Sequence, residues 1–156
     1  MGIRASGDCS MNCDQVHKLQ PGHRASTPEH AGDGSSRILV VEDDDLVLAA
    51  VTRRLVRLGY SVVGVSSAKD AMAVLTAGNV FEYLLADIML TGRVTGMMLA
   101  EQVRSLWPAI GIALMTGYQE FALPDSDCSD GFPLLLKPFA SADLVHVLDR
   151  LATVAV

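Results

Sequence analysis

The sequence predicts one α/β domain with a doubly wound, five-stranded parallel sheet. Two observations support this fold class. Short apolar runs alternate with amphipathic helical segments from Arg37 onward, so that a strand followed by a helix occurs five times. The apolar runs are nearly continuous instead of alternating with polar residues, which indicates strands that are buried on both faces between two layers of helices.

Five apolar runs are the expected strands. They are short, as buried strands are, and turn or helix signals bound them. The runs cover residues 38–41, 60–65, 81–86, 110–115 and 134–136. The first run ends in acidic residues, and Asp87 directly follows the third.

Helical spacing predicts a helix after each of the first three strands. In the first helix, 46–58, four apolar residues share one face, namely Leu48, Val51, Leu55 and Leu58. The arginines at positions 53, 54 and 57 lie off this face. The second begins at the capping residue Ser67 and ends before Gly78. The third, 97–106, aligns Leu99, Val103 and Leu106.

The last two predicted helices differ in strength. A fourth helix within residues 118–132 is the weakest element, since the segment contains Pro124 and little periodicity, and we expect it to be short, displaced or mobile. The fifth helix has four inward-facing apolar residues, with Ser141 as the expected N-cap. These inward residues are Leu144, Val147, Leu148 and Leu151.

Composition restricts the functional classes. The 156-residue chain has a formal net charge of -6, which argues against direct DNA or RNA binding, because phosphate contacts need a basic face. No apolar run reaches the roughly 18 residues of a membrane span. The three cysteines form no disulfide framework, so a reducing compartment and a cytoplasmic protein are expected.

Residues 1–36 are expected to form a disordered tail, and residues 37–156 the folded domain. The tail is rich in Gly, Ser, Asp, His and Pro, and it holds too few large apolar groups to offset the entropy of ordering. Its cysteines and histidines allow zinc binding as a minor alternative, although their spacing matches known zinc sites poorly.

Polar residues follow four of the strands at the same edge of the sheet. In parallel sheets, sites form beyond the carboxyl ends of the strands. Glu42 and Asp43 follow the first strand, Asp87 the third, Thr116 the fourth and Lys137 the fifth. Clustered carboxylates suit Mg²⁺, a carboxylate can attack phosphorus, and a metal, an ammonium and a hydroxyl can stabilise the transferring group.

Four motifs around these residues resemble the receiver domains of two-component response regulators. They are Ile38-Leu-Val-Val-Glu-Asp-Asp, Leu85-Ala-Asp-Ile-Met-Leu, Leu114-Met-Thr-Gly-Tyr and Leu136-Lys-Pro-Phe, which occur in the family's order. The resemblance covers about residues 37–156 and implies the flavodoxin-like strand order 2-1-3-4-5.

The resemblance implies a role for each site residue. Asp87 is the phosphoacceptor, and a phosphohistidine of a histidine kinase or phosphotransfer protein is the donor. Asp43, Asp87 and the backbone carbonyl of Met89 contact Mg²⁺ directly, whereas Glu42 does so through water. Lys137 binds the phosphoryl oxygens and precedes a cis proline bond. Thr116 moves toward the phosphoryl group.

The sequence departs from the common family pattern in several places. The loop after Asp87 is one residue longer than the commonest form, as in receivers of hybrid kinases. Leu134 replaces the usual aromatic switch residue, which places that switch in doubt. Met89 and Tyr118 are expected to hinder the hydrolytic water and to slow self-dephosphorylation. The chain ends after the fifth helix, so we expect output through a downstream protein partner or onward phosphotransfer.

Alternatives remain open at this stage. A phosphatase of the haloacid dehalogenase type also uses a carboxylate nucleophile, and the pair Asp43 and Asp45 imitates its first motif, but Asp87 would then be idle. A phosphorylation-independent pseudo-receiver would keep only the fold. Asp44 and Asp45 are expected to cap the first helix. We expect that the protein is not an enzyme that turns over a substrate.

Overall fold

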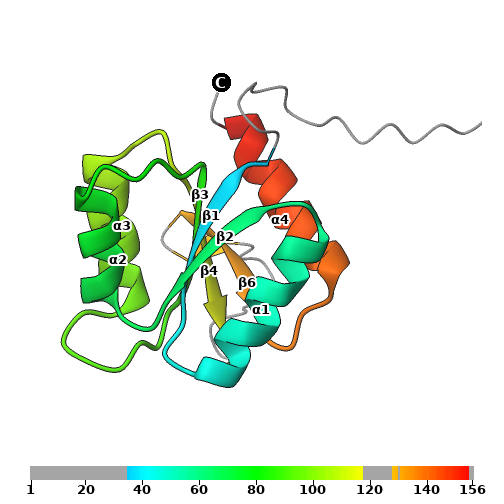
Figure 1. Cartoon of the computed structure of the whole chain (residues 1–156), viewed down its shortest axis with the longest axis horizontal. Coiled ribbons are helices and arrows are strands. Elements are labelled where there is room, and N and C mark those ends of the chain that lie inside the picture. The colour runs from blue at the N-terminus through cyan, green and yellow to red at the C-terminus, as the bar shows by residue number, and fades with distance from the viewer. Residues whose placement is uncertain (1–34, 118–127, 130, 155–156) are drawn as a thin grey trace, which may run out of the picture.

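Five parallel strands form the centre of the fold (Figure 1). The computed structural model describes residues 35–117, 128–129 and 131–154. In spatial order the parallel strands are β2 (Ser61–Val65), β1 (Arg37–Val41), β3 (Tyr83–Asp87), β4 (Gly111–Thr116) and β6 (Phe132–Leu136). Since β6 is the fifth strand expected from the sequence, the predicted fold class and the order 2-1-3-4-5 are confirmed.

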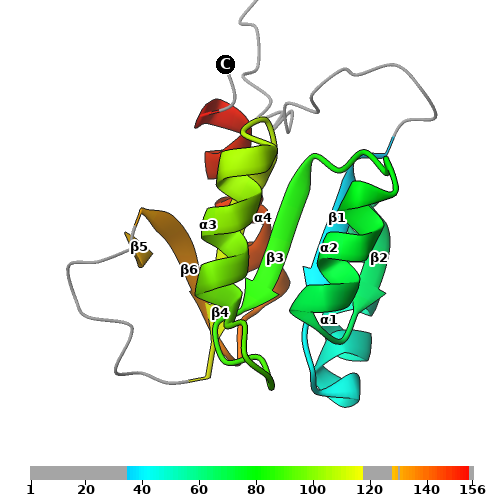
Figure 2. The same cartoon turned by 90° about the vertical axis from the view of Figure 1, so that its left-hand side faces the viewer.

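Four described helices cover the two faces of the sheet (Figures 1 and 2). They are α1 (Asp45–Arg57), α2 (Ala68–Thr76), α3 (Gly96–Leu106) and α4 (Ser141–Val154). α2 and α3 lie on one face, and α1 and α4 on the other. Residues 118–127, which hold most of the predicted weak helix, lie outside the described residues. None of the described helices is long and apolar enough to cross a bilayer.

A sixth strand, β5 (Cys128–Ser129), is absent from the sequence prediction. It pairs antiparallel with the start of β6, with Cys128 opposite Pro133 and Ser129 opposite Phe132. Gly131 closes the turn with a φ of 86°, a conformation that favours glycine. Two polar-flanked residues carry no detectable period, and Pro133 is typical of edge strands, so pattern alone misses both this strand and the first two residues of β6.

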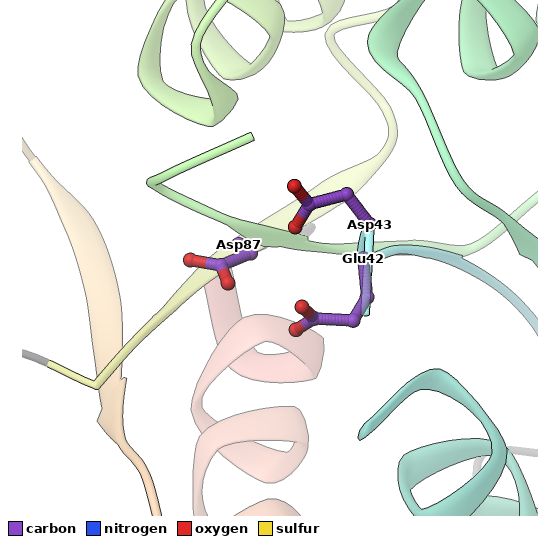
Figure 3. A group of neighbouring side chains, drawn as sticks. All are labelled: Glu42, Asp43 and Asp87. Atoms are coloured by element: carbon purple, nitrogen blue, oxygen red, sulfur yellow. The ribbon is translucent and has the colours of Figure 1, made fainter. Parts of the chain in front are cut away.

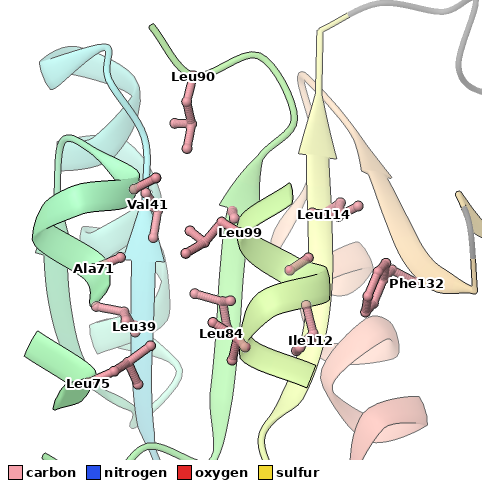
Figure 4. Close-up of a cluster of buried hydrophobic side chains, with 14 of the residues drawn as sticks. Leu39, Val41, Ala71, Leu75, Leu84, Leu90, Leu99, Ile112, Leu114 and Phe132 are labelled. Carbon is pink, nitrogen blue, oxygen red and sulfur yellow. The ribbon is translucent and has the colours of Figure 1, made fainter. Parts of the chain in front are cut away.

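Both faces of the sheet are buried. Along β1, Leu39 and Val41 pack with α2 and α3 (Figure 4), whereas Ile38 and Val40 pack with α1 and α4. All four side chains have no exposed surface. This alternation explains why the strand sequences are continuously apolar, since each residue reaches one of two cores.

The ends of α1, α3 and α4 test the helix predictions. Asp44 caps α1 as expected, because its Oδ1 accepts from the N–H groups of the second and third helical residues at 2.9 and 3.1 Å. The prediction for Ser141 is wrong: it is the first helical residue, and the preceding Ala140 donates its N–H to Asp143 Oδ2 at 2.7 Å. Leu106 does not face inward but is 56% exposed, since α3 ends there and Trp107 packs against the core instead.

Candidate functional site

The predicted site residues lie at the carboxyl edge of the sheet. Glu42 and Asp43 follow β1, Asp87 ends β3, Thr116 ends β4, and Lys137 follows β6. These strands are neighbours in the order β1-β3-β4-β6, so parallel pairing brings their carboxyl ends together. Residues far apart in sequence therefore share one rim of the molecule.

Three carboxylates form an acidic group at this rim (Figure 3). Glu42, Asp43 and Asp87 each offer an oxygen, and these oxygens all lie within 4.8 Å of one another. Glu42 is 1% exposed and Asp87 is 7% exposed, so water screens them poorly. Buried carboxylates at this separation repel one another unless a cation joins them. An all-oxygen donor set of this kind fits Mg²⁺.

Lys137 supplies a cation within hydrogen-bond distance of two of these carboxylates. Its Nζ lies 2.5 Å from Glu42 Oε2 and 2.6 Å from Asp87 Oδ2. The backbone holds it there, because the N–H of Lys137 donates to the carbonyl of Thr116 at 2.7 Å. The bond between Lys137 and Pro138 is cis, as the family resemblance implies. The ammonium therefore bridges the phosphoacceptor candidate and an acidic neighbour.

Burial and charge shift two pKa values in the site. Burial raises the pKa of Glu42, the hydrogen bond from Lys137 opposes this rise, and the charge of Asp87 adds to it. Burial alone would lower the pKa of Lys137, but its hydrogen bonds to Asp87 and Glu42 outweigh burial and raise it. Lys137 is therefore charged at neutral pH, and Glu42 is a carboxylate that further positive charge would stabilise.

Backbone N–H groups orient the carboxylates. Asp87 Oδ1 accepts from the N–H of Met89 at 3.0 Å, and Asp43 Oδ2 accepts from the N–H of Thr91 at 3.1 Å. The lengthened loop after Asp87 thus folds back onto both residues. The second oxygen of Asp87 stays directed at Lys137.

α3 approaches the site through Gly96, a residue that the sequence analysis did not single out. The N–H of Gly96 donates to the carbonyl of Ile88 at 3.0 Å. A Cβ atom at Gly96 would lie only 1.8 Å from the carbonyl oxygen of Asp87. No side chain fits there, so α3 can pack this closely behind the acceptor only with glycine at its first position.

We expect Gly96→Ala to lower the free energy of unfolding by about 1–3 kcal/mol, because the new methyl group overpacks against the backbone of Asp87. Gly117→Ala is the matched control, since a Cβ there meets no atom within 4 Å. Urea denaturation of the two variants measures the difference. Equal stability of both variants would contradict this account of the packing.

The structure gathers four of the predicted site residues and positions the others beside them. The three carboxylates lie together, Lys137 contacts Glu42 and Asp87, and Thr116 is fully buried at the end of the adjacent strand. The side chain of Met89 is 51% exposed at the rim. Tyr118 lies outside the described residues. The coordination by the Met89 carbonyl stays a prediction.

Comparison with known proteins identifies the family. The model of the response regulator receiver domain matches residues 38–149. The chain belongs to the response regulator receiver family. The receiver is 32% identical over 120 residues to the receiver protein CpdR of Brucella abortus, covering 76% of this chain and 98% of CpdR. It is 29% identical over 120 residues to the sensor kinase CckA of the same organism, of which it spans 13%.

Solved structures give the same fold. A response regulator receiver protein from Sinorhizobium medicae superposes with a TM-score of 0.67 at 26% identity, over 78% of this chain and 98% of that one. TrrA of Thermotoga maritima, solved with Mg²⁺ and BeF, has a TM-score of 0.65 at 24% identity, over 74% of this chain and 98% of that one. The family match, and not the shared fold, assigns the chain to a family of two-component signalling domains that are not classical enzymes, which counts against the phosphatase alternative.

Proposed function

We propose that the receiver accepts a phosphoryl group on Asp87 from a phosphohistidine and then signals through protein contacts. The donor would be a histidine kinase or a phosphotransfer protein. One observation carries the proposal: the Asp87 carboxylate lies 2.6 Å from the Lys137 ammonium and in one acidic group with Glu42 and Asp43. This arrangement combines a nucleophile with positive charge for the group being transferred.

The proposed step exchanges one phosphorus bond for another. An oxygen of the Asp87 carboxylate forms a bond to phosphorus, while the P–N bond to the donor imidazole breaks. The electron pair of that bond stays on nitrogen, and the imidazole leaves neutral when its second nitrogen carries a proton. The product is an acyl phosphate on Asp87, and no further reactant is needed.

Asp43 and Asp87 would hold Mg²⁺ directly, Glu42 would hold it through water, and the backbone carbonyl of Met89 would be a further ligand. When bound, Mg²⁺ supplies positive charge to the oxygens of the transferring phosphoryl group. The close carboxylate oxygens and the raised pKa of Glu42 support this assignment, because both features favour an added cation.

Lys137 and Thr116 would act on the phosphoryl group itself. Lys137 Nζ, already 2.6 Å from Asp87 Oδ2, is within reach of a phosphoryl group on that oxygen. Thr116 lies at the end of β4, and its backbone carbonyl accepts the N–H of Lys137, so the two residues are mechanically linked. The Thr116 hydroxyl would move toward the phosphoryl group and report its presence.

Phosphoramidate, a small P–N donor, tests the proposal with the full chain. We expect intact-mass analysis to show the gain of one phosphoryl group in the presence of Mg²⁺ and none without it. Asp87→Asn should show no gain. Failure of the wild-type chain to gain mass, together with failure to bind beryllofluoride, would favour the pseudo-receiver alternative instead.

We expect Met89→Asn to speed hydrolysis of the acyl phosphate several-fold. Met89 is two residues from Asp87, its N–H donates to Asp87 Oδ1, and its side chain is exposed. We infer that this apolar side chain hinders the hydrolytic water on its way to the acceptor. Met98→Asn is the control, since Met98 is equally exposed at 51% but lies on α3. The rate of hydrolysis is measured from the loss of the phosphorylated mass over time. If Met89→Asn and the wild type lose the phosphoryl group at the same rate, Met89 does not hinder the hydrolytic water.

The output partner is proposed to bind the face formed by the predicted fourth helix, β6 and α4. Leu134 on β6 and His146 on α4 border a pocket of about 310 Å³ on this face. Leu134 cannot act as an aromatic switch. We therefore propose that phosphorylation is signalled by a local change of order in the predicted fourth helix. Chemical-shift changes on beryllofluoride binding should concentrate on β6 and α4, and a response on another face would refute this assignment.

The division into a tail of residues 1–36 and a receiver domain of residues 37–156 remains a prediction. Two observations support it: β1 begins at Arg37, and the family match begins at residue 38.

A further inference from the structure

A four-residue loop, 137–140, carries Lys137 from β6 to α4. The N–H of Lys137 donates to the carbonyl of Thr116, and the N–H of Ala140 donates to Asp143, each at 2.7 Å. The first end of the loop is therefore tied to β4, the neighbour of β6 in the sheet, and the second end is tied to α4. Between these ends, Pro138 has no N–H to donate.

The middle of the loop is tied to a helix from the other end of the domain sequence. Arg54 of α1 donates from Nη1 to the backbone carbonyl of Phe139. This hydrogen bond spans 85 residues of sequence and links α1 directly to the segment that carries Lys137. A guanidinium donor gives a charge-assisted bond, which is stronger than one between neutral groups.

The surroundings of Arg54 correct the sequence prediction, which placed it with Arg53 and Arg57 off the apolar face. Arg53 and Arg57 are exposed, but Arg54 is half-buried. It borders a groove of about 380 Å³ between α1 and the loop, together with apolar residues of both. A charged group in such a setting costs free energy unless it is hydrogen-bonded, so the contact with Phe139 satisfies a group that the apolar groove would otherwise disfavour.

We propose that Arg54 is a positioning residue for phosphoryl transfer, which holds the loop so that Lys137 Nζ reaches Asp87 and Glu42. This inference rests on the proposed function, in which Lys137 binds the phosphoryl group. Lys137 is two residues from Phe139, whose carbonyl accepts the hydrogen bond from Arg54. Its Nζ lies 2.5 Å from Glu42 and 2.6 Å from Asp87, so even a small shift of the loop would disturb these contacts. The ring of Phe139 is buried in the core with α4, so loss of Arg54 alone loosens the backbone without removing the loop's packing.

Arg54→Met is the first test, since it keeps the length and the apolar stem but removes the donors. We expect the phosphoramidate reaction of the folded protein to slow by about ten- to hundredfold, the range for a misplacement of about 1 Å. Arg53→Met is the matched control, because Arg53 is exposed on the same helix, and it should react at the wild-type rate. Arg54→Lys keeps the charge and a donor and should recover part of the rate.

The NMR signals of the Lys137 ε-methylene group report position independently of any reaction. In the wild type they should differ from those of the exposed Lys69, and in Arg54→Met they should move toward them. A merely structural Arg54 would lower stability while leaving both the rate and the Lys137 signals unchanged, and that result would overturn the proposal. If the wild type takes up no phosphoryl group, the proposed function fails, whereas the Lys137 signals still decide whether Arg54 positions this residue.

A measurement on the wild type covers the case in which Arg54→Met does not fold. A guanidinium bonded to Phe139 rotates slowly about its Nε–Cζ bond, and NMR should show this hindrance for Arg54 but not for Arg53 or Arg57. Free rotation of all three groups would overturn the proposal.

Discussion

We expect Lys137→Met to slow phosphorylation of Asp87 by about 10²–10³-fold, the loss expected when one preorganised charged or hydrogen-bonding group is removed from a transition-state site. The ammonium lies 2.6 Å from Asp87 Oδ2, within reach of the equatorial oxygens of a phosphoryl group that transfers to this carboxylate, which carry the negative charge of the transition state. Methionine keeps much of the apolar volume and removes the charge. The rate is measured with phosphoramidate and Mg²⁺ by intact-mass analysis.

The control for this prediction is Lys69→Met. Lys69 is exposed on α2, away from the acidic group, so its loss changes the net charge by the same amount. Only the Lys137 variant should lose rate. A comparable loss in both variants would show that overall charge, and not the contact with Asp87, controls the reaction.

We expect Mg²⁺ to stabilise the fold of the wild-type chain and to fail to do so once Asp43 is replaced. At a concentration of 100 times its Kd, a ligand that binds only the folded state adds about 2.7 kcal/mol to the free energy of unfolding. Asp43→Asn should lose most of this increment, because it removes one of the three carboxylates of the acidic group that is proposed to hold the ion. Urea denaturation with Mg²⁺ and with a chelator measures the increment in each protein.

The increment, and not the absolute stability, is the correct quantity for this comparison. Asp43→Asn also relieves repulsion among the carboxylates, so the variant is expected to be no less stable than the wild type without Mg²⁺. Asp45→Asn is the control, since Asp45 is exposed in the first turn of α1. An undiminished increment in Asp43→Asn would contradict the assignment of Mg²⁺ to this group.

Much of the fold could be predicted because the decisive signals are local. Residues such as Leu39 and Val40 follow one another in a single apolar run, and they pack on opposite faces of the sheet. Asp87 and Lys137 each stand directly after such a run, so the rule that sites form at the carboxyl ends of strands brings them together. The acidic group and its cation therefore follow from chain order and parallel pairing alone.

The features that could not be predicted depend on tertiary contacts. Arg54 differs from Arg53 only in which neighbour it meets, and that neighbour is a carbonyl 85 residues away. Gly96 looks like an ordinary loop glycine in the sequence, whereas in the folded chain a Cβ there would lie only 1.8 Å from the carbonyl oxygen of Asp87. The capping of α4 by Asp143 in place of Ser141 depends on where the loop from β6 enters the helix.

The geometry also separates the two carboxylates that could serve as nucleophile. Asp43 Oδ2 accepts an N–H from Thr91, whereas Asp87 Oδ2 faces the Lys137 ammonium. Asp45, the second acid of the phosphatase-like motif, is exposed on α1. Among the described residues, the hydrogen bond from the Lys137 ammonium to Asp87 favours Asp87 over Asp43 as the proposed nucleophile.

The most direct measurement is the identification of the residue that carries the phosphoryl group. The phosphorylated chain is reduced with borohydride, which converts an aspartyl phosphate to homoserine, and the digest is sequenced by mass spectrometry. We predict homoserine at position 87 alone. Homoserine at position 43, or none anywhere, would contradict the claim that Asp87 is the phosphoacceptor.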